Sequence, residues 1–233
     1  MTIKFIKSAN IAPIFNFMTQ KNSTRISPSS SLHRLPVRVG FDLDGVLLYN
    51  PVRNFRPLIS WFKKVFLHRR KIKFFVPKSA WQQQVFIWLH QTSLWVAPGL
   101  AEIKALKAAG LIEPYLITAR FGFLRPDTQR WLKALKAETV FTEICINDHD
   151  QQPFIFKAQQ IKRLKLEMFV EDNWDIVKKL QELVLPDQPN FVCWWVSNIL
   201  DWPISYRYKV KTLQQAVMAM GQKLQQADLK SRK

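Results

Sequence analysis

The chain has 233 residues, of which 48% are hydrophobic and 13% aromatic, and its formal net charge at pH 7 is +18. This length is sufficient for one α/β domain with a modest insertion, and the hydrophobic share excludes an intrinsically disordered protein. The sequence contains no run of about eighteen apolar residues, so we expect no transmembrane segment.

The positive charge is concentrated in the first half of the chain. No Asp or Glu occurs in residues 1–41, and none occurs between Asp44 and Glu102. A positive field of this kind favours anionic partners, namely phosphorylated metabolites, nucleic acid or an acidic membrane surface. The alternative is a solvated basic face that only improves solubility.

Residues 1–35 are expected to form a basic, flexible extension. Their composition is basic, rich in serine and free of acids, which is typical of an organelle transit peptide. A non-functional extension, or translation that starts at Met18, is the alternative. The two cysteines, Cys145 and Cys193, lie in apolar runs, so buried free thiols are expected. Free thiols fit a reducing compartment and favour a cytoplasmic location.

A short apolar run at residues 37–41 predicts a buried strand that delivers two carboxylates into a turn. Alternation along the strand places Asp42 and Asp44 on the same side, and Gly45 permits a sharp turn directly after them. Two acids so close together repel each other unless a cation or a reacting group lies between them. This arrangement suits a magnesium ion and phosphoryl transfer.

An insertion at residues 49–98 interrupts the chain after this strand, and we expect it to form a small helical cap. Apolar spacing predicts one helix at 55–67 and a second at 79–91. Trp81 and Trp88 fall on one face of the second helix, and we expect this face to pack onto the core. The cap is basic throughout; its cationic residues are Arg53, Arg56, Lys63, Lys64, Arg69, Arg70, Lys71, Lys73 and Lys78.

Strands and helices alternate regularly after the insertion. Helices are predicted at 100–109, 126–136, 156–164 and 174–183, and strands at 112–118, 141–146, 168–170 and 191–196. Near-continuous apolar strands in such an alternation predict an α/β fold, a Rossmann-like parallel sheet with helices on both faces. The core domain would then comprise residues 36–48 and 99–210. Residues 211–233 would form a C-terminal surface helix and tail.

Polar side chains gather where the predicted strands end. Thr118 and Arg120 follow the second strand, Glu171 and Asp172 follow the fourth, and Lys157 opens the helix before that strand. Because folds of this class place their sites at the carboxyl ends of the strands, these side chains are expected to lie on one rim of the sheet together with Asp42 and Asp44.

Four sequence motifs in this order resemble those of the haloacid dehalogenase-like phosphohydrolase superfamily. Asp42-Leu43-Asp44-Gly45-Val46 is similar to the first motif, Thr118 to the second, Lys157 to the third and Glu171-Asp172 to the fourth. The resemblance covers roughly residues 36–196. The local sequence around Thr118 and Asp172 is similar to that of the branch with 5′-nucleotidase-like and deoxyribonucleotidase-like members.

The resemblance implies a role for each motif residue. Asp42 would attack phosphorus to give an aspartyl-phosphate, and Asp44 would act as general acid and then as general base. Asp42, Asp172 and the Asp44 carbonyl would hold Mg²⁺. Thr118 would donate a hydrogen bond to the phosphoryl oxygens, and Lys157 would neutralise their developing charge.

Several assignments have competitors. Lys162 and Lys165 compete with Lys157 for the third motif, but they lie near the far end of the predicted helix. Glu171 departs from the frequent Asp-Asp pair of the family. It is interpreted as a hydrogen-bond acceptor that contacts the groups around the metal rather than the metal itself. Asp175 could supplement Asp172, although an acid in the first turn of a helix is the simpler interpretation.

The residues near the second motif also leave alternatives open. Arg120 could contact substrate, or it could form an ion pair with Asp148 or Asp150. His149 lies on the same rim and is interpreted as a loop residue rather than a ligand.

The predicted function is that of an Mg²⁺-dependent phosphatase, a hydrolase of phosphoric monoesters acting on a small anionic substrate such as a nucleotide. By the same resemblance, a cap of this size partly covers the site and favours a small or medium phosphoester. The alternatives are a phosphomutase of the same fold, or a protein that associates with nucleic acid or an anionic membrane through the basic cap.

Overall fold

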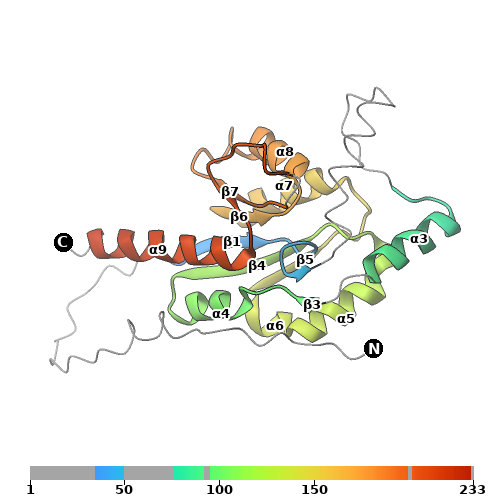
Figure 1. Ribbon diagram of the computed structural model, residues 1–233, viewed down its shortest axis with the longest axis horizontal. Helices are drawn as coiled ribbons and strands as arrows, with labels where there is room; N and C mark the ends of the chain where they lie inside the picture. Colours follow the sequence, from blue (N-terminus) through green and yellow to red (C-terminus); the bar gives the residue numbers. More distant parts are fainter. Residues whose placement is uncertain (1–34, 50–75, 92–94, 199–200, 232–233) are drawn as a thin grey trace.

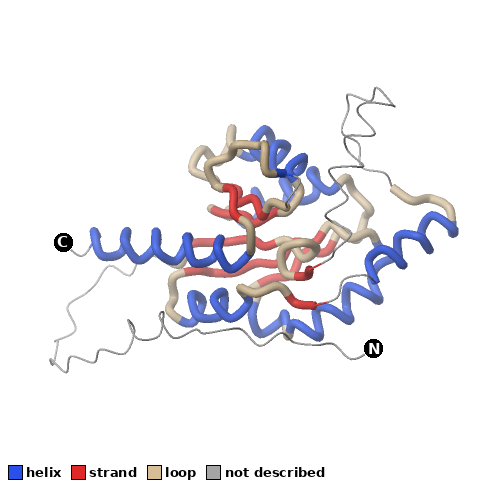
Figure 2. Tube along the Cα trace, viewed as in Figure 1, coloured by secondary structure: helices blue, strands red, loops and turns tan. Residues whose placement is uncertain are grey.

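The computed structural model describes residues 35–49, 76–91, 95–198 and 201–231. The predicted helix at 55–67, most of the basic residues of the cap and nearly all of the N-terminal extension lie outside the described residues. Within the described part, the fold class predicted from the sequence is confirmed, since helices cover both faces of a six-stranded sheet (Figures 1 and 2).

All neighbouring strands of this sheet run parallel, in the order β5-β4-β1-β6-β7-β8. The strands are β1 (Val37–Phe41), β4 (Ile112–Thr118), β5 (Glu143–Ile146), β6 (Met168–Glu171), β7 (Val192–Val196) and β8 (Lys209–Val210). The central β1 pairs Phe41 with Leu116 of β4 and with Val170 of β6. This register brings the carboxyl ends of β1, β4 and β6 side by side.

Two separate hydrophobic clusters fill the space between the sheet and its helices. On one face pack α4 (Leu100–Ala108), α5 (Arg125–Leu135), α6 (Ala137–Val140) and α9 (Leu213–Ser231), and on the other α7 (Pro153–Leu164) and α8 (Trp174–Val184). Apolar residues on both faces of β1 and β4 are buried, as expected for strands covered on both sides. The rigid sheet therefore holds the loops at its carboxyl edge in fixed positions.

The C-terminal helix has one buried side. A surface helix was expected within residues 211–233, and α9 there buries Ala216, Val217 and Met220 in the cluster shared with α4 and β1. Its apolar residues recur at helical spacing, so the helix is amphipathic and its apolar side covers the sheet. The two-residue strand β8 before it was not predicted, because so short a strand has no recognisable alternation.

The second cap helix is confirmed, but the packing of its tryptophan face differs from the prediction. In α3 (Ala80–Gln91) the side chains of Trp81 and Trp88 are 69% and 65% exposed, so among the described residues they do not pack onto the core. The helix instead contacts the short helix η2 (Gly122–Leu124) through Phe86, whose ring lies 6.4 Å from that of Phe123. A two-stranded antiparallel ribbon, β2 (Leu48–Tyr49) with β3 (Trp95–Val96), closes the insertion at its base.

Two smaller expectations can also be compared with the structure. Among the described helices, none is both long enough and apolar enough to cross a bilayer. Cys145 and Cys193 are buried and free, as predicted.

Candidate active site

The loop after β1 is held tightly against the end of β6. The Asp42 N–H donates to the Val170 carbonyl at 3.0 Å, which extends the β1–β6 pairing to the first carboxylate. Gly45 has a φ of +80°, and a Cβ atom at this position would lie 2.1 Å from Oδ2 of Asp172. Only glycine fits here, because its backbone adopts a positive φ and approaches the Asp172 carboxylate directly.

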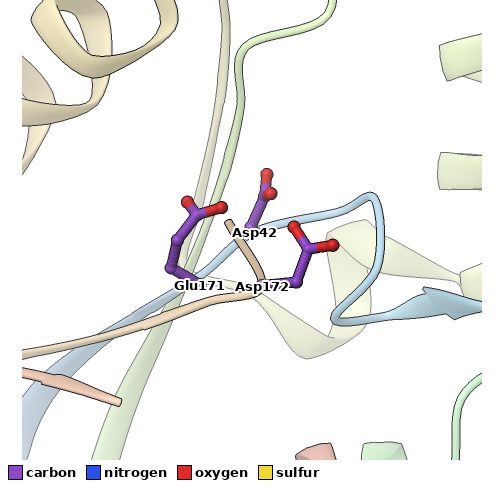
Figure 3. A group of neighbouring side chains, drawn as sticks. All are labelled: Asp42, Glu171 and Asp172. Carbon is purple, nitrogen blue, oxygen red and sulfur yellow. The ribbon is translucent and has the colours of Figure 1, made fainter. Parts of the chain in front are cut away.

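Three carboxylates from β1 and β6 converge at this edge of the sheet. Asp42, Glu171 and Asp172 are buried, and each offers a carboxylate oxygen within 4.8 Å of the others (Figure 3). The backbone of Asp172 is fixed by the buried Trp195, whose indole N–H donates to the Asp172 carbonyl at 3.2 Å. Close, buried carboxylates repel one another, so this geometry favours a bound cation.

Lys157 of α7 links two of these carboxylates. Its Nζ lies 2.9 Å from Asp42 Oδ2 and 2.6 Å from Glu171 Oε2. The other oxygen of Glu171 accepts the Asn173 N–H at 3.0 Å, so Glu171 is held from two sides. Lys157 does not open its helix as predicted, since α7 begins at Pro153. The lysine lies one turn further along, where its side chain reaches Asp42.

The protonation equilibria of this cluster follow from burial and mutual charge. Burial raises the pKa of Asp42 well above its ordinary range; the Lys157 ammonium opposes this shift, and the neighbouring carboxylates add to it. Burial likewise raises the pKa of Glu171. Burial alone would lower the pKa of Lys157, but Asp42 and Glu171 outweigh it and raise the pKa. The two carboxylates therefore favour the ammonium form of Lys157.

Arg120 forms a second buried ion-pair group around Asp44. Its Nε and Nη2 donate to the two oxygens of Asp44 at 2.7 and 2.6 Å, and its Nη1 donates to Asp127 Oδ2 at 2.8 Å. The Arg120 backbone N–H lies 3.4 Å from the Thr118 hydroxyl oxygen. Thr118, at the end of β4, is itself buried. The segment 118–120 thus connects the second motif to Asp44.

The remaining sequence candidates lie elsewhere. Arg120 does not pair with Asp148 or Asp150 as one alternative predicted: Asp148 pairs with Arg125, and Asp150 accepts the Gly122 N–H. Lys162 pairs with Asp187 on the surface, and Lys165 ends α7. Asp175 pairs with Lys178 within α8, and no ligand role follows for it. Asp127 was missed because an acid in the first turn of a helix is usually explained by the helix dipole.

The donor set fits a hard divalent cation. Magnesium prefers oxygen ligands and is commonly bound by one or two carboxylates together with water and substrate phosphate. Asp42 and Asp172 would supply the carboxylates. The Asp44 carbonyl would be a further ligand, and it lies in the loop whose Gly45 backbone approaches the Asp172 carboxylate. Both oxygens of Glu171 have protein partners, Lys157 and the Asn173 N–H, so Glu171 is suited to support the ligands rather than to replace one.

Comparisons with known proteins bear on the fold. No protein-family model matches the sequence, and no curated protein sequence matches it. The solved structure of a protein classed as a β-phosphoglucomutase, from Thermotoga maritima, is similar at a TM-score of 0.50 and 15% identity, covering 80% of this chain and 99% of that one.

Two further solved structures align at lower TM-scores. CbbY from Rhodobacter sphaeroides, in complex with phosphate, has a TM-score of 0.49 and 13% identity, over 76% of this chain and 95% of that one. A HAD-superfamily hydrolase from Ehrlichia chaffeensis has a TM-score of 0.45 and 13% identity, over 81% and 98%. The match to the Thermotoga maritima protein shows that this chain has the Rossmann-type α/β fold predicted from its sequence.

Proposed function

We propose that the protein is an Mg²⁺-dependent phosphomonoester hydrolase that acts through an aspartyl-phosphate on Asp42. The observation that carries the proposal is the convergence of Asp42, Asp172 and Lys157 at one edge of the sheet, from three separate segments of the chain. A fold can host many functions, so it is this site, together with the motif order, that supports the activity.

The first half-reaction transfers the phosphoryl group to Asp42. A carboxylate oxygen of Asp42 forms a bond to phosphorus while the bond to the leaving oxygen breaks, and Asp44 gives that oxygen its proton. The Lys157 ammonium and the Thr118 hydroxyl stabilise the charge on the phosphoryl oxygens. Bound Mg²⁺ would offset the negative charge shared by the phosphoryl group and the carboxylates.

The second half-reaction returns Asp42 to its starting state. Asp44, now a carboxylate, takes a proton from water; the water oxygen bonds to phosphorus, and the phosphorus–Asp42 bond breaks. Asp44 engages Arg120 through both oxygens in the structure, so the leaving group and the water would meet a carboxylate whose orientation is already set.

A small anionic substrate, such as a nucleotide, fits the charge of the chain. The insertion at residues 49–98 contains no acid, and Arg125, the first residue of α5, is exposed. A phosphoester with further negative charge would be attracted by this field. The local sequences of the second and fourth motifs resemble those of 5′-nucleotidase-like proteins, which supports a nucleotide as the substrate.

The test is a screen of phosphorylated metabolites for phosphate release, with and without Mg²⁺. Asp42→Asn is the blank, since it keeps the shape of the side chain and removes the nucleophile. Phosphate release by the wild-type chain only with Mg²⁺, none by Asp42→Asn, and a phosphorylated peptide containing Asp42 after acid quenching would support the proposal. Equal release by both chains would refute it.

A phosphomutase is the alternative outcome at the same site. The Thermotoga maritima protein of similar fold is classed as a β-phosphoglucomutase. In a phosphomutase the phosphoryl group on Asp42 would pass to a second substrate hydroxyl instead of water. Positional exchange of phosphate in a sugar phosphate, without net phosphate release, would identify this outcome.

We further propose that α3 attaches the protein to an anionic membrane surface. Trp81, Val85 and Trp88 form an exposed face on this helix, which has no Asp, Glu, Lys or Arg, within a stretch of chain that carries only positive charges between Asp44 and Glu102. Tryptophan side chains favour the membrane interface, and basic flanks favour anionic headgroups.

Sedimentation with phosphatidylserine vesicles tests this attachment. A variant with Trp81 and Trp88 changed to Ser should lose binding, whereas Trp202→Ser should not, although Trp202 is 81% exposed. Equal binding by both variants refutes the assignment. Binding to single-stranded oligonucleotides but not to vesicles would also refute it and would indicate a nucleic-acid partner. Self-association of the protein through this face would refute it as well.

A further inference from the structure

The Asp44 carboxylate is held by a side chain from a distant segment of the chain. Arg120 contacts both of its oxygens with parallel N–H donors, at 2.7 and 2.6 Å. A two-point contact of this kind fixes the plane of the carboxylate as well as its position. Asp44 and Arg120 are 76 residues apart in the chain, so this contact is a product of the fold.

Arg120 is in turn oriented from α5. Its side chain is 1% exposed, and its remaining terminal nitrogen, Nη1, donates to Asp127 Oδ2 at 2.8 Å. Asp127 is 10% exposed and also engages Arg130, at the surface. The guanidinium therefore lies between two carboxylates, one in the proposed site and one on a helix packed against the sheet.

We propose that Asp127 is a positioning residue of the site, which acts through Arg120 to hold the Asp44 carboxylate in its working orientation. The inference rests on the proposed function, because it gives Asp44 the acid and base role. Asp127 contacts Arg120 through a terminal nitrogen different from those that contact Asp44, so it can fix the guanidinium without competing for the same donors.

The arrangement also explains how Asp44 can change partners without losing its position. When one Asp44 oxygen turns to the leaving group or to water, the other can keep its contact with Arg120. Asp127 meanwhile holds the guanidinium in place and offsets its buried charge. Without Asp127, the Arg120 side chain could move together with Asp44 or turn toward solvent. The orientation of the Asp44 carboxylate would then no longer be fixed.

The test is Asp127→Asn in the full chain, compared with Asp187→Asn as a matched control. Asp187 pairs with Lys162 on the surface and belongs to neither ion-pair group of the site. An error of about 1 Å in placing a catalytic group costs about 10²-fold in rate. We therefore expect the kcat of Asp127→Asn to fall about 10- to 100-fold, with KM changed by less than about twofold. The control should match wild type.

A second variant separates positioning from folding. Arg120→Ala should lose activity and regain at least about tenfold on addition of guanidinium ion, whereas Arg120→Lys, which has no planar fork, should remain poorly active. Lack of rescue in a folded Arg120→Ala chain, an unchanged kcat in Asp127→Asn, or a change confined to KM would each overturn the proposal.

A crystal structure of Asp127→Asn supplies a readout that needs no activity. A displaced or rotated Asp44 carboxylate supports the proposal, and an Asp44–Arg120 contact unchanged from wild type overturns it. Absence of phosphatase activity in the wild-type chain would refute the proposed function instead. The two failures are therefore distinguishable.

Discussion

Gly45→Ala tests whether the loop after β1 and the Asp172 carboxylate form one unit. Both Gly45 and Gly110 have positive φ, +80° and +67°, so alanine at either position carries a backbone cost of about 1 to 2 kcal/mol. At Gly110 an added Cβ meets nothing within 4 Å, but at Gly45 it would lie 2.1 Å from Asp172 Oδ2. Gly110→Ala is therefore a control for the backbone cost alone.

The excess loss at Gly45 measures the contact with Asp172. Forcing an atom into a packed site typically costs about 1 to 3 kcal/mol, so Gly45→Ala should lose that amount beyond Gly110→Ala. The displaced Asp172 should also bind metal poorly. At a Mg²⁺ concentration of about 100 times Kd, a bound ion adds about 2.7 kcal/mol to the free energy of unfolding, and Gly45→Ala should lose this gain.

Urea unfolding of wild type, Gly45→Ala and Gly110→Ala, each with and without Mg²⁺, supplies the measurement. Wild type and Gly110→Ala should be stabilised by Mg²⁺ to the same extent, and Gly45→Ala should be stabilised much less. If the two alanine variants lose equal stability and respond equally to Mg²⁺, Asp172 does not depend on the Gly45 backbone, and the reasoning is refuted.

Three other changes act on the same cluster. Lys157→Met leaves Asp42 and Glu171 buried without their shared ammonium. In the absence of metal at pH 7, this variant should have a free energy of unfolding about 3 to 5 kcal/mol lower than wild type. A loss below about 1 kcal/mol would contradict the pairing. Burial raises the pKa of Asp42 above its unfolded value, so the contribution of Asp42 to the stability of the metal-free chain should fall as the pH rises above about 4. Asp42→Asn should lose less over that range, and parallel profiles would argue against the shift. Trp195→Phe removes the N–H donor to the Asp172 carbonyl and should cost about 1 to 3 kcal/mol in urea unfolding and weaken Mg²⁺ binding in calorimetry.

The convergence at the sheet edge could be predicted because it follows from topology. Apolar strand runs and helix periodicity define a parallel sheet, and in such a sheet residues that follow different strands share one rim. Asp42, Thr118 and Asp172 needed only this rule. Lys157 required in addition the resemblance to a family, since its helix begins three residues earlier than its periodicity suggested.

The ion-pair partners could not be predicted, because they depend on side-chain reach rather than on strand order. Asp127 lies in a helix rather than at the end of a strand and belongs to no motif, yet it forms an ion pair with Arg120. The exposure of Trp81 and Trp88 was missed for a related reason. Helical spacing shows that two residues share a face, but it does not show which neighbour that face meets.

The two ion-pair groups give Asp42 and Asp44 different surroundings, although the two residues are nearly adjacent in the chain. Lys157 lies beside Asp42 and Glu171, whereas Arg120 lies beside Asp44 and Asp127. The proposed mechanism requires such separation, because it assigns the nucleophile to Asp42 and the proton transfers to Asp44.

The three carboxylates beside β1 and β6 concentrate negative charge in a small buried volume. Asp42, Glu171 and Asp172 each offer a carboxylate oxygen within 4.8 Å of the others, and Lys157 contacts two of the three. Under the proposed function, a divalent cation held by Asp42 and Asp172 would offset this charge where a phosphoryl group would arrive. Arg120 and Asp127 would hold Asp44 apart from this cluster, so the two ion-pair groups match the two proposed chemical roles.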